Sequence, residues 1–390
     1  MSVTARTNEN DPEGQVVDLN DESDVYPDDR EWVDKCIARL RGDLAPRQTK
    51  LDEIPLPSAL GELKLYLKRE ADQLSGSHKH RLAAALLTHA LASGWLAKGQ
   101  CVVEASSGST AISEAWYCRQ LGIKFYAVVP KNTAPEKQKL IETYGGDVVP
   151  VSGDIVEWAR RVAKRYDGHF MDQFSYAERA YDWRGEHSLA AELLGAVPKL
   201  SWFTMGAGTG GTGTSVARYA RYNSKGLRVC VPDPDHSAYF DGWYWKDPAV
   251  TDQGSQIEGI GRPRVEASFV PTTVNRMIRV HDAASVATMR YLSDRMDIHA
   301  GPSTGTGVFS AIRILLGMAN GDPKGSVATV MCDSGDRYTN EFYNDEWLAA
   351  KNIDYQPWYA TIGQFFETGD WAPPTTVQPT PRPMTTLWNM

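Results

Sequence analysis

A glycine-rich segment at residues 205–214 carries a clear chemical signal, reading Met-Gly-Ala-Gly-Thr-Gly-Gly-Thr-Gly-Thr. It follows a predicted strand at 200–204 and leads into a predicted helix at 213–223. Glycines allow several backbone N–H groups to turn toward one point, and the N-terminus of the next helix adds partial positive charge. The segment therefore predicts a binding site for a phosphate group.

Two other interpretations of this segment stay open. Gly206, Gly208 and Gly211 fit the GxGxxG pattern, which would suit a dinucleotide such as NAD or FAD. The segment does not lie in a first βαβ unit, however, and the acidic residue about 20 positions further on, Asp233, stands between two prolines. A dinucleotide is therefore less well supported than a simpler phosphate. A glycine turn that binds no ligand is the remaining interpretation.

A second turn, Ser106–Ala111, follows a predicted strand at 101–104 and opens a predicted helix at 110–121. Hydroxyl groups and backbone N–H groups at the start of a helix suit an anion such as a carboxylate. Read alone, the same residues would equally suit an ordinary Ser/Thr N-cap without a ligand.

A third turn, Gly76–Arg81, places Lys79 just before an apolar helix predicted at 81–97. Partial burial would lower the pKa of the amine and make it a nucleophile at neutral pH. Read alone, this lysine is more typical of a solvated surface charge. The order of the three turns favours chemistry, because a reactive lysine, a carboxylate site and a monophosphate site together describe pyridoxal 5′-phosphate (PLP) enzymes.

The sequence resembles the fold-type II PLP enzymes of the cysteine synthase and cystathionine β-synthase family over roughly residues 50–345. The family's Gly-Thr-Gly-Gly-Thr phosphate loop is present unchanged. The matching segments, in chain order, are Ser77-His78-Lys79, Ser106–Ala111, Gln173-Phe174, Gly208–Thr212, Glu258–Gly261, Gly301-Pro302-Ser303 and Gly335–Tyr338.

The resemblance implies a role for each matched position. Lys79 is implied to bind PLP as a Schiff base and to act as the catalytic base on the substrate Cα. Further cofactor contacts are implied for Ser109, Gly208, Thr209, Gly210, Gly211, Thr212 and Ser303. Contacts to the amino-acid substrate are implied for Ser106, Ser107, Gly108, Thr110, Gln173 and Gly259. No metal ion is implied.

Two positions depart from the family pattern. Ser109 stands where the family has an asparagine that hydrogen-bonds the 3′ oxygen of the cofactor, so a shorter hydroxyl or a bridging water is expected there. Ala111 stands where the family has glycine. Together with the segment Cys332–Tyr338, this turn is most similar to bacterial L-cysteine desulfhydrases of the family.

The resemblance implies a PLP-dependent lyase that performs α,β-elimination on a β-substituted L-amino acid. With L-cysteine the products would be hydrogen sulfide, pyruvate and ammonia. Ser303 is a neutral partner for the pyridine nitrogen, and the weaker electron sink that results suits prompt β-elimination better than transamination.

Three alternatives remain on the same scaffold. A β-replacement synthase, of the cysteine synthase or cystathionine β-synthase type, would use the same residues. A serine or threonine dehydratase is less well supported, because those relatives usually have a phosphate loop richer in glycine. A binding protein without catalytic activity is disfavoured by the intact lysine and phosphate loop.

Short β-rich runs alternate with helix-like stretches from about residue 50 onward, which predicts parallel sheets covered by helices. The resemblance gives this α/β class a more specific form, two open αβα domains of the tryptophan synthase β-like fold. Ligands of such sheets lie at the carboxyl ends of the strands. The other helices are expected at 31–43, 134–144, 154–166, 179–194, 283–296 and 306–319, and the other strands at 125–129, 147–151, 228–231 and 327–331.

The domain division is predicted as follows. Residues 1–44 form an acidic leader whose first 30 or so residues are disordered, 45–84 with 186–345 form a large PLP-binding domain, and 85–185 form a small mobile substrate-binding domain. Residues 346–390, rich in tryptophan and proline, form an arm without regular structure, because proline fixes φ and removes a backbone donor.

The composition excludes several classes of protein. The charge of −8, from 41 basic and 49 acidic residues, does not suit nucleic acid or an anionic membrane. No apolar run reaches the ~18 residues of a membrane span, and no signal-peptide core is present. The five cysteines show no CxxC spacing. We expect a cytoplasmic enzyme for a small amino acid, and the resemblance implies a homodimer.

Overall fold

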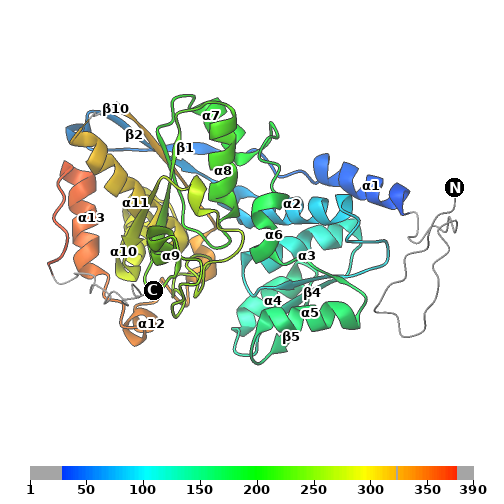
Figure 1. Ribbon diagram of the computed structural model, residues 1–390. Helices are drawn as coiled ribbons and strands as arrows, with labels where there is room; N and C mark the ends of the chain where they lie inside the picture. The colour runs from blue at the N-terminus through cyan, green and yellow to red at the C-terminus, as the bar shows by residue number, and fades with distance from the viewer. Residues whose placement is uncertain (1–28, 322–323, 376–390) are drawn as a thin grey trace, which may run out of the picture.

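The computed structural model describes residues 29–321 and 324–375. Two lobes lie side by side, and helix α1 (Arg30–Arg41) lies on the lobe that holds α2 and α3 (Figure 1). The disordered start predicted for the acidic leader falls on residues that lie outside this description up to residue 28, as does the last part of the predicted arm from residue 376.

The larger sheet, within the described residues, has six strands in the order β1-β2-β10-β7-β8-β9. Neighbouring strands run parallel except for β1 and β2, which pair antiparallel. The strands are β1 (Leu51–Ile54), β2 (Glu62–Lys68), β7 (Trp202–Thr204), β8 (Arg228–Pro234), β9 (Arg276–Val280) and β10 (Lys324–Val330). The helices of this lobe are α7 (Leu189–Ala196), α8 (Gly211–Tyr222), α9 (Tyr239–Trp245), α10 (Asp282–Met296), α11 (Pro302–Ala319), α12 (Asp345–Ala350) and α13 (Gln356–Thr368).

Helix α11 is the centre of the large lobe and is buried along most of its length. Val308, Ile312 and Leu315 pack into one apolar cluster with residues of β2, β10 and α10. Helices α10 and α11 approach closely at Gly305, where a Cβ atom would lie 2.1 Å from the Ser285 carbonyl oxygen. This packing fixes the N-terminus of α11, and with it Ser303, against the sheet.

The smaller sheet has four strands in the order β5-β4-β3-β6 among the described residues, and all of them are parallel. Its strands are β3 (Val102–Ala105), β4 (Phe125–Pro130), β5 (Asp147–Val151) and β6 (His169–Phe170). The helices around it are α2 (Lys79–Ala92), α3 (Ser109–Leu121), α4 (Pro135–Thr143), α5 (Ile155–Arg165) and α6 (Gln173–Ala180). Figure 1 shows these elements together as one lobe.

The fold is therefore α/β with two sheets that are parallel or nearly so, as predicted. Each sheet draws its strands from one of the two predicted domains. The boundaries of those domains stay a prediction. In the part of the chain that the structure describes, no helix has the length and apolar character needed to cross a membrane.

The single helix predicted at 179–194 is wrong. The chain forms two shorter helices there, α6 and α7, and the segment between them is irregular. Each helix begins at its own N-cap, because the Asp172 side chain accepts from the Ser175 N–H and the Ser188 side chain accepts from the Ala191 N–H. The two N-caps therefore start two separate helices, although the apolar pattern of the sequence indicated a single one.

The prediction that the C-terminal arm has no regular structure is also wrong for part of its length. Helix α13 occupies residues 356–368, and Trp358, Ile362 and Phe365 are buried in the core of the large lobe. Pro357 lies in the first turn of this helix, where a missing backbone donor costs nothing. The proline cluster that motivated the prediction begins only at residue 373.

Candidate active site

Lys79 is the first residue of α2 and ends a turn that is tied to the segment after β10. Ser77 pairs with Asp333 in an isolated antiparallel bridge, and the His78 N–H donates to the Cys332 carbonyl over 2.9 Å. The Lys79 side chain is buried, with 8% of its surface exposed. The lysine is thus fixed at the carboxyl end of the large sheet, where parallel sheets bind ligands.

Burial lowers the pKa of Lys79 to about 8, because the ammonium form loses its hydration. Cys332 and Asp333 act in the opposite direction, and Arg262 adds to the lowering. An amine with this pKa is partly unprotonated near neutral pH, so it can accept a proton or act as a nucleophile.

The glycine-rich loop connects β7 to α8 and comes close to Lys79. A Cβ atom on Gly208 would lie 2.3 Å from the Gly259 carbonyl oxygen and 3.6 Å from the Lys79 amine nitrogen. Gly210 has a φ of +82° and serves as the N-cap of α8 without any side-chain capping bond. The N-cap residue therefore has no side chain that could cap the N–H groups at the start of α8. An anion site at a helix start needs N–H groups that are not blocked in this way.

The serine-rich turn connects β3 to α3 and has the same character. Gly108 is the N-cap of α3 and offers no side-chain cap. Just inside the helix, the Thr110 hydroxyl donates to the Gln173 side-chain oxygen over 2.8 Å, and both residues are 3% exposed. This bond joins the segments 106–111 and 173–174, and its two residues are 63 positions apart in the sequence.

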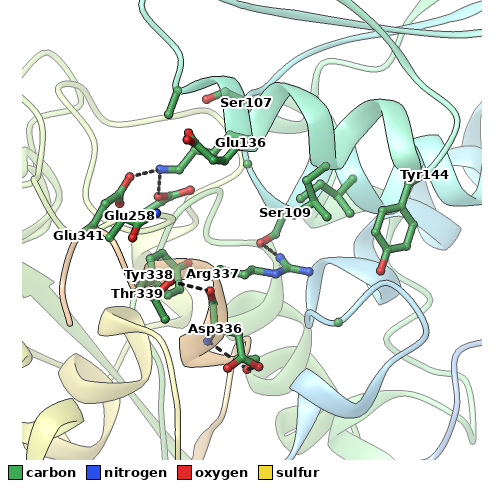
Figure 2. Close-up of a pocket in the computed structure, with 18 residues that line it drawn as sticks. Ser107, Ser109, Glu136, Tyr144, Glu258, Asp336, Arg337, Tyr338, Thr339 and Glu341 are labelled. Carbon is green, nitrogen blue, oxygen red and sulfur yellow. Dashed lines mark hydrogen bonds and ion pairs between the residues drawn. The ribbon is translucent and has the colours of Figure 1, made fainter. Parts of the chain in front are cut away.

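Ser109 lies in a polar network that the sequence did not predict. Figure 2 shows Arg337 pointing toward Ser109, and the guanidinium donates to the Ser109 hydroxyl over 2.6 Å. A second nitrogen of Arg337 donates to the Ser75 carbonyl over 2.6 Å. The Ser109 hydroxyl also lies 3.3 Å from a carboxylate oxygen of Asp333, which accepts from Tyr338 as well. Arg337 therefore links the turn before Lys79 to the start of α3.

A cavity of about 540 Å³ lies between α3, α4 and the segment 334–341. Its lining includes Ser107, Ser109 and Arg337, and Figure 2 shows Arg337 next to Ser109. Lys137 of α4 forms ion pairs with Glu258 at 2.6 Å and with Glu341 at 3.0 Å. These pairs join the small lobe to the large one beside the cavity.

Ser303 lies in the first turn of α11 and is 6% exposed. It hydrogen-bonds the Cys332 side chain, whose pKa is raised to about 12, mainly because the thiol is buried. The thiol next to Lys79 therefore stays protonated, and it does not compete with the lysine as a nucleophile.

The structure places the other predicted site residues as follows. The Ser106 hydroxyl accepts from the Gly108 N–H over 3.3 Å, and the Thr209 hydroxyl accepts from the Gly211 N–H over 3.2 Å. The Thr212 hydroxyl lies 3.2 Å from the Tyr181 hydroxyl. These contacts organise the two turns; their contacts to ligands stay predictions.

Sequence reasoning missed several residues at this site. Arg337 lies inside the family motif Gly335–Tyr338, and Asp333 lies in the longer segment Cys332–Tyr338, yet neither segment indicated a role for these two side chains. Tyr239, whose hydroxyl donates to the Gly208 carbonyl over 2.6 Å, and Lys137 gave no signal in the sequence.

Comparison with known proteins identifies the family. The model of the pyridoxal-phosphate dependent enzyme family matches residues 43–333. This chain belongs to that family. It is therefore a PLP-dependent enzyme, as the resemblance implied.

Individual relatives agree with this assignment. The chain is 42% identical over 354 residues to the L-cysteine desulfhydrase Cds1 of Mycobacterium tuberculosis. This alignment covers 88% of this chain and 96% of that protein. It is 28% identical to cysteine synthase B of Escherichia coli, over 70% of this chain and 86% of that protein. A crystal structure of O-ureido-L-serine synthase has a TM-score of 0.67 and 26% identity, covering 77% of this chain and 96% of that one.

The residues of this chain fit the cofactor of the family. A side chain at Gly208 would fill the space between the phosphate loop and the Lys79 amine, so glycine keeps that space open. Gly210, the N-cap residue of α8, has no side chain that could occupy the helix start, and burial lowers the pKa of the nearby lysine amine. A ligand with one aldehyde and one phosphate matches this donor set.

Two buried glutamates lie in the small lobe behind the serine-rich turn. Glu104 lies in β3 and Glu114 lies on α3, and both are 0% exposed. Burial raises the pKa of Glu104 to about 8, and burial followed by the charge of Glu104 raises the pKa of Glu114 well above its usual range. Both oxygens of Glu114 lack a hydrogen-bond partner in the described structure.

Glu114→Gln is expected to reduce the pH dependence of stability. In the unfolded chain a glutamate titrates near ~4.3, so above that pH the folded chain holds a proton that the unfolded chain has lost. The free energy of unfolding then falls by about 1.4 kcal/mol per pH unit until the folded pKa is passed. In urea unfolding, the free energy of unfolding of the variant should therefore increase relative to that of the wild type as the pH rises from 5 to 8. If the free energy of unfolding changed equally with pH in the two proteins, the raised pKa of Glu114 would be contradicted.

Proposed function

We propose that this enzyme is an L-cysteine desulfhydrase. It converts L-cysteine and water to hydrogen sulfide, pyruvate and ammonia. The observation that carries the proposal is the 42% identity to the Mycobacterium tuberculosis desulfhydrase over 88% of this chain, against 26–28% for the synthases cited above. The Ser-Ser-Gly-Ser-Thr-Ala turn, which departs from the synthase pattern at Ser109 and Ala111, supports the same choice.

The cofactor site is proposed to use residues from three turns. Lys79 would hold PLP covalently, and Gly208–Thr212 with the start of α8 would bind its phosphate. Ser303, at the start of α11, is proposed to face the pyridine nitrogen, and Ser109 to lie near the 3′ oxygen. When bound, PLP supplies an electron sink that acidifies the Cα proton of an amino acid.

The substrate carboxylate is proposed to bind at the start of α3. Ser106, Ser107, Gly108 and Thr110 offer backbone N–H and hydroxyl groups there, and Gln173 lies against Thr110. Gly259, whose carbonyl lies close to Gly208, is proposed to border the substrate from the opposite side. A carboxylate at this helix N-terminus gains from the helix dipole and fixes the orientation of the Cα–H bond.

Lys79 is proposed to move the proton at Cα. Its amine is shielded from water by burial, and its lowered pKa leaves part of it unprotonated near pH 7. A base with a pKa close to the working pH combines availability with driving force. Arg337 and the ion pairs of Lys137 border the cavity from which the β substituent would leave.

A β-replacement synthase is the second candidate. It is favoured by the likeness to O-ureido-L-serine synthase and by the cavity of about 540 Å³, which has room for a second reactant. Both activities begin with loss of the β substituent. The desulfhydrase then hydrolyses the C–N bond at Cα to give pyruvate and ammonia, whereas the synthase adds a second nucleophile at Cβ and keeps the amino group.

A panel of β-substituted alanines separates these candidates. Purified enzyme would be incubated with L-cysteine, O-acetyl-L-serine and L-serine, with and without an added thiol, and assayed for sulfide, pyruvate and replacement amino acids. We expect sulfide and pyruvate in equal amounts from L-cysteine. Replacement products without pyruvate would favour the synthase. No product from any substrate would favour a binding protein, and a Lys79→Ala preparation serves as the blank.

We also propose that the enzyme works in the cytoplasm as a homodimer. All five cysteines are free and buried, which fits a reducing compartment. The dimer is proposed from the family resemblance. Light scattering of the purified protein tests it, and a monomer mass would refute it.

A further inference from the structure

Glu104 makes hydrogen bonds that set it apart from an ordinary buried glutamate. One carboxyl oxygen accepts from the N–H of Ala105, the last residue of β3, over 2.7 Å, directly before the serine-rich turn. The other accepts from the Gln173 N–H over 3.2 Å, at the start of α6. The Gln173 side chain contacts the same carboxylate. One buried carboxyl thus joins the two segments proposed to bind the substrate carboxylate.

The contact at Gln173 holds a strained piece of backbone. Asp172, which precedes it, has a φ of +46°, a conformation that residues other than glycine rarely adopt. Such a conformation persists only where the surroundings fix it from several sides. The Glu104 bond to the Gln173 N–H and the Asp172 cap on Ser175 provide two of these constraints.

The bonds also form a chain that ends at the substrate site. Both oxygens of Glu104 accept hydrogen bonds from backbone N–H groups, so the Gln173 amide turns its nitrogen toward this carboxyl group. The Gln173 side-chain oxygen then faces Thr110 and accepts from its hydroxyl over 2.8 Å. The orientation of the Gln173 amide and of the Thr110 hydroxyl is therefore set by a residue outside the cavity lining.

We propose that Glu104 is a positioning residue for the substrate carboxylate. It acts through Gln173 and Thr110, it controls the affinity for amino acids with a free carboxylate, and it does not affect cofactor retention. The inference rests on the carboxylate site proposed above, although it does not depend on which β substituent leaves.

Glu104→Gln is the test, and Glu114→Gln is its matched control. Both glutamates are fully buried in the same lobe, but the Glu114 oxygens hold no group of the site. A glutamine at 104 keeps the shape and loses one acceptor, so one buried N–H is left without a partner. Binding of L-alanine, which has no β leaving group, would be measured by calorimetry on the PLP-loaded enzyme. L-alaninamide would be compared as a ligand without the carboxylate.

We expect Glu104→Gln to weaken L-alanine binding by about tenfold, the loss expected for one hydrogen bond to a charged group. Binding of L-alaninamide and PLP content should stay close to wild type, and Glu114→Gln should bind both ligands normally. Glu104→Asp, which keeps the carboxyl group on a side chain one methylene shorter, should also weaken L-alanine binding.

Three results would overturn the proposal. Unchanged L-alanine binding in Glu104→Gln is the first, and equal weakening of L-alanine and L-alaninamide is the second. An equal loss in Glu114→Gln is the third, because it would point to general damage of the lobe. Failure of the wild type to release sulfide from L-cysteine would refute the desulfhydrase instead, and the L-alanine comparison would still stand.

Discussion

Replacing Lys79 by alanine is expected to abolish turnover of L-cysteine and to remove the covalent link to PLP. The buried amine is the group that the fold places beside the phosphate loop, where a Cβ on Gly208 would come within 3.6 Å of it. Its lowered pKa suits both proposed roles, as the attachment point and as the base. Loss of a residue that carries both roles should cost far more than the 10²–10⁴-fold, approximately, of a general base alone.

Reduction with sodium borohydride, followed by peptide mass mapping, checks the attachment directly. The wild type should carry the cofactor mass on the peptide that contains Lys79, and Lys79→Ala should carry none. Lys98→Ala, at an exposed lysine, is the control and should behave like the wild type. Cofactor mass on another lysine, or residual turnover in Lys79→Ala, would show that the catalytic lysine lies elsewhere.

Gly210→Asp is expected to weaken PLP binding by about a hundredfold or more, equivalent to losing one or two charge-assisted hydrogen bonds. One reason follows from the sequence alone, because the aspartate would place a negative charge beside the phosphate. The structure adds another, because Gly210 has a φ of +82° and its Cβ would lie 2.8 Å from Phe269 Cα. Both effects displace the N–H groups at the start of α8.

Equilibrium titration of the apoenzyme with PLP measures this loss, and two further variants separate its causes. Gly210→Ala carries the backbone strain without the charge, so it should weaken binding less than Gly210→Asp. Gly213→Ala lies one turn further on, where a Cβ meets only Val229 at 3.9 Å, and should bind PLP normally. An unchanged affinity in Gly210→Asp would rule out this loop as the phosphate site.

The sequence predicted most elements that carry an uninterrupted local pattern. The helices predicted at 110–121 and 283–296 are observed at 109–121 and 282–296, and the strand at 147–151 is observed as predicted. The strand at 62–68 was missed, although its burial alternates for most of its length as in a half-buried strand. The two-residue strand β6 is too short to give any period.

The sequence by itself determined the phosphate loop, the serine-rich turn and the lysine turn, because each depends on backbone freedom and helix starts within a few residues. Only the tertiary structure decided which side chains meet there. Arg337 reaches Ser109 across 228 residues, Lys137 reaches Glu258 across 121, and Glu104 reaches Gln173 across 69. Such contacts depend on how two sheets pack and which carboxylates become buried, and residue spacing along the chain carries no information on either.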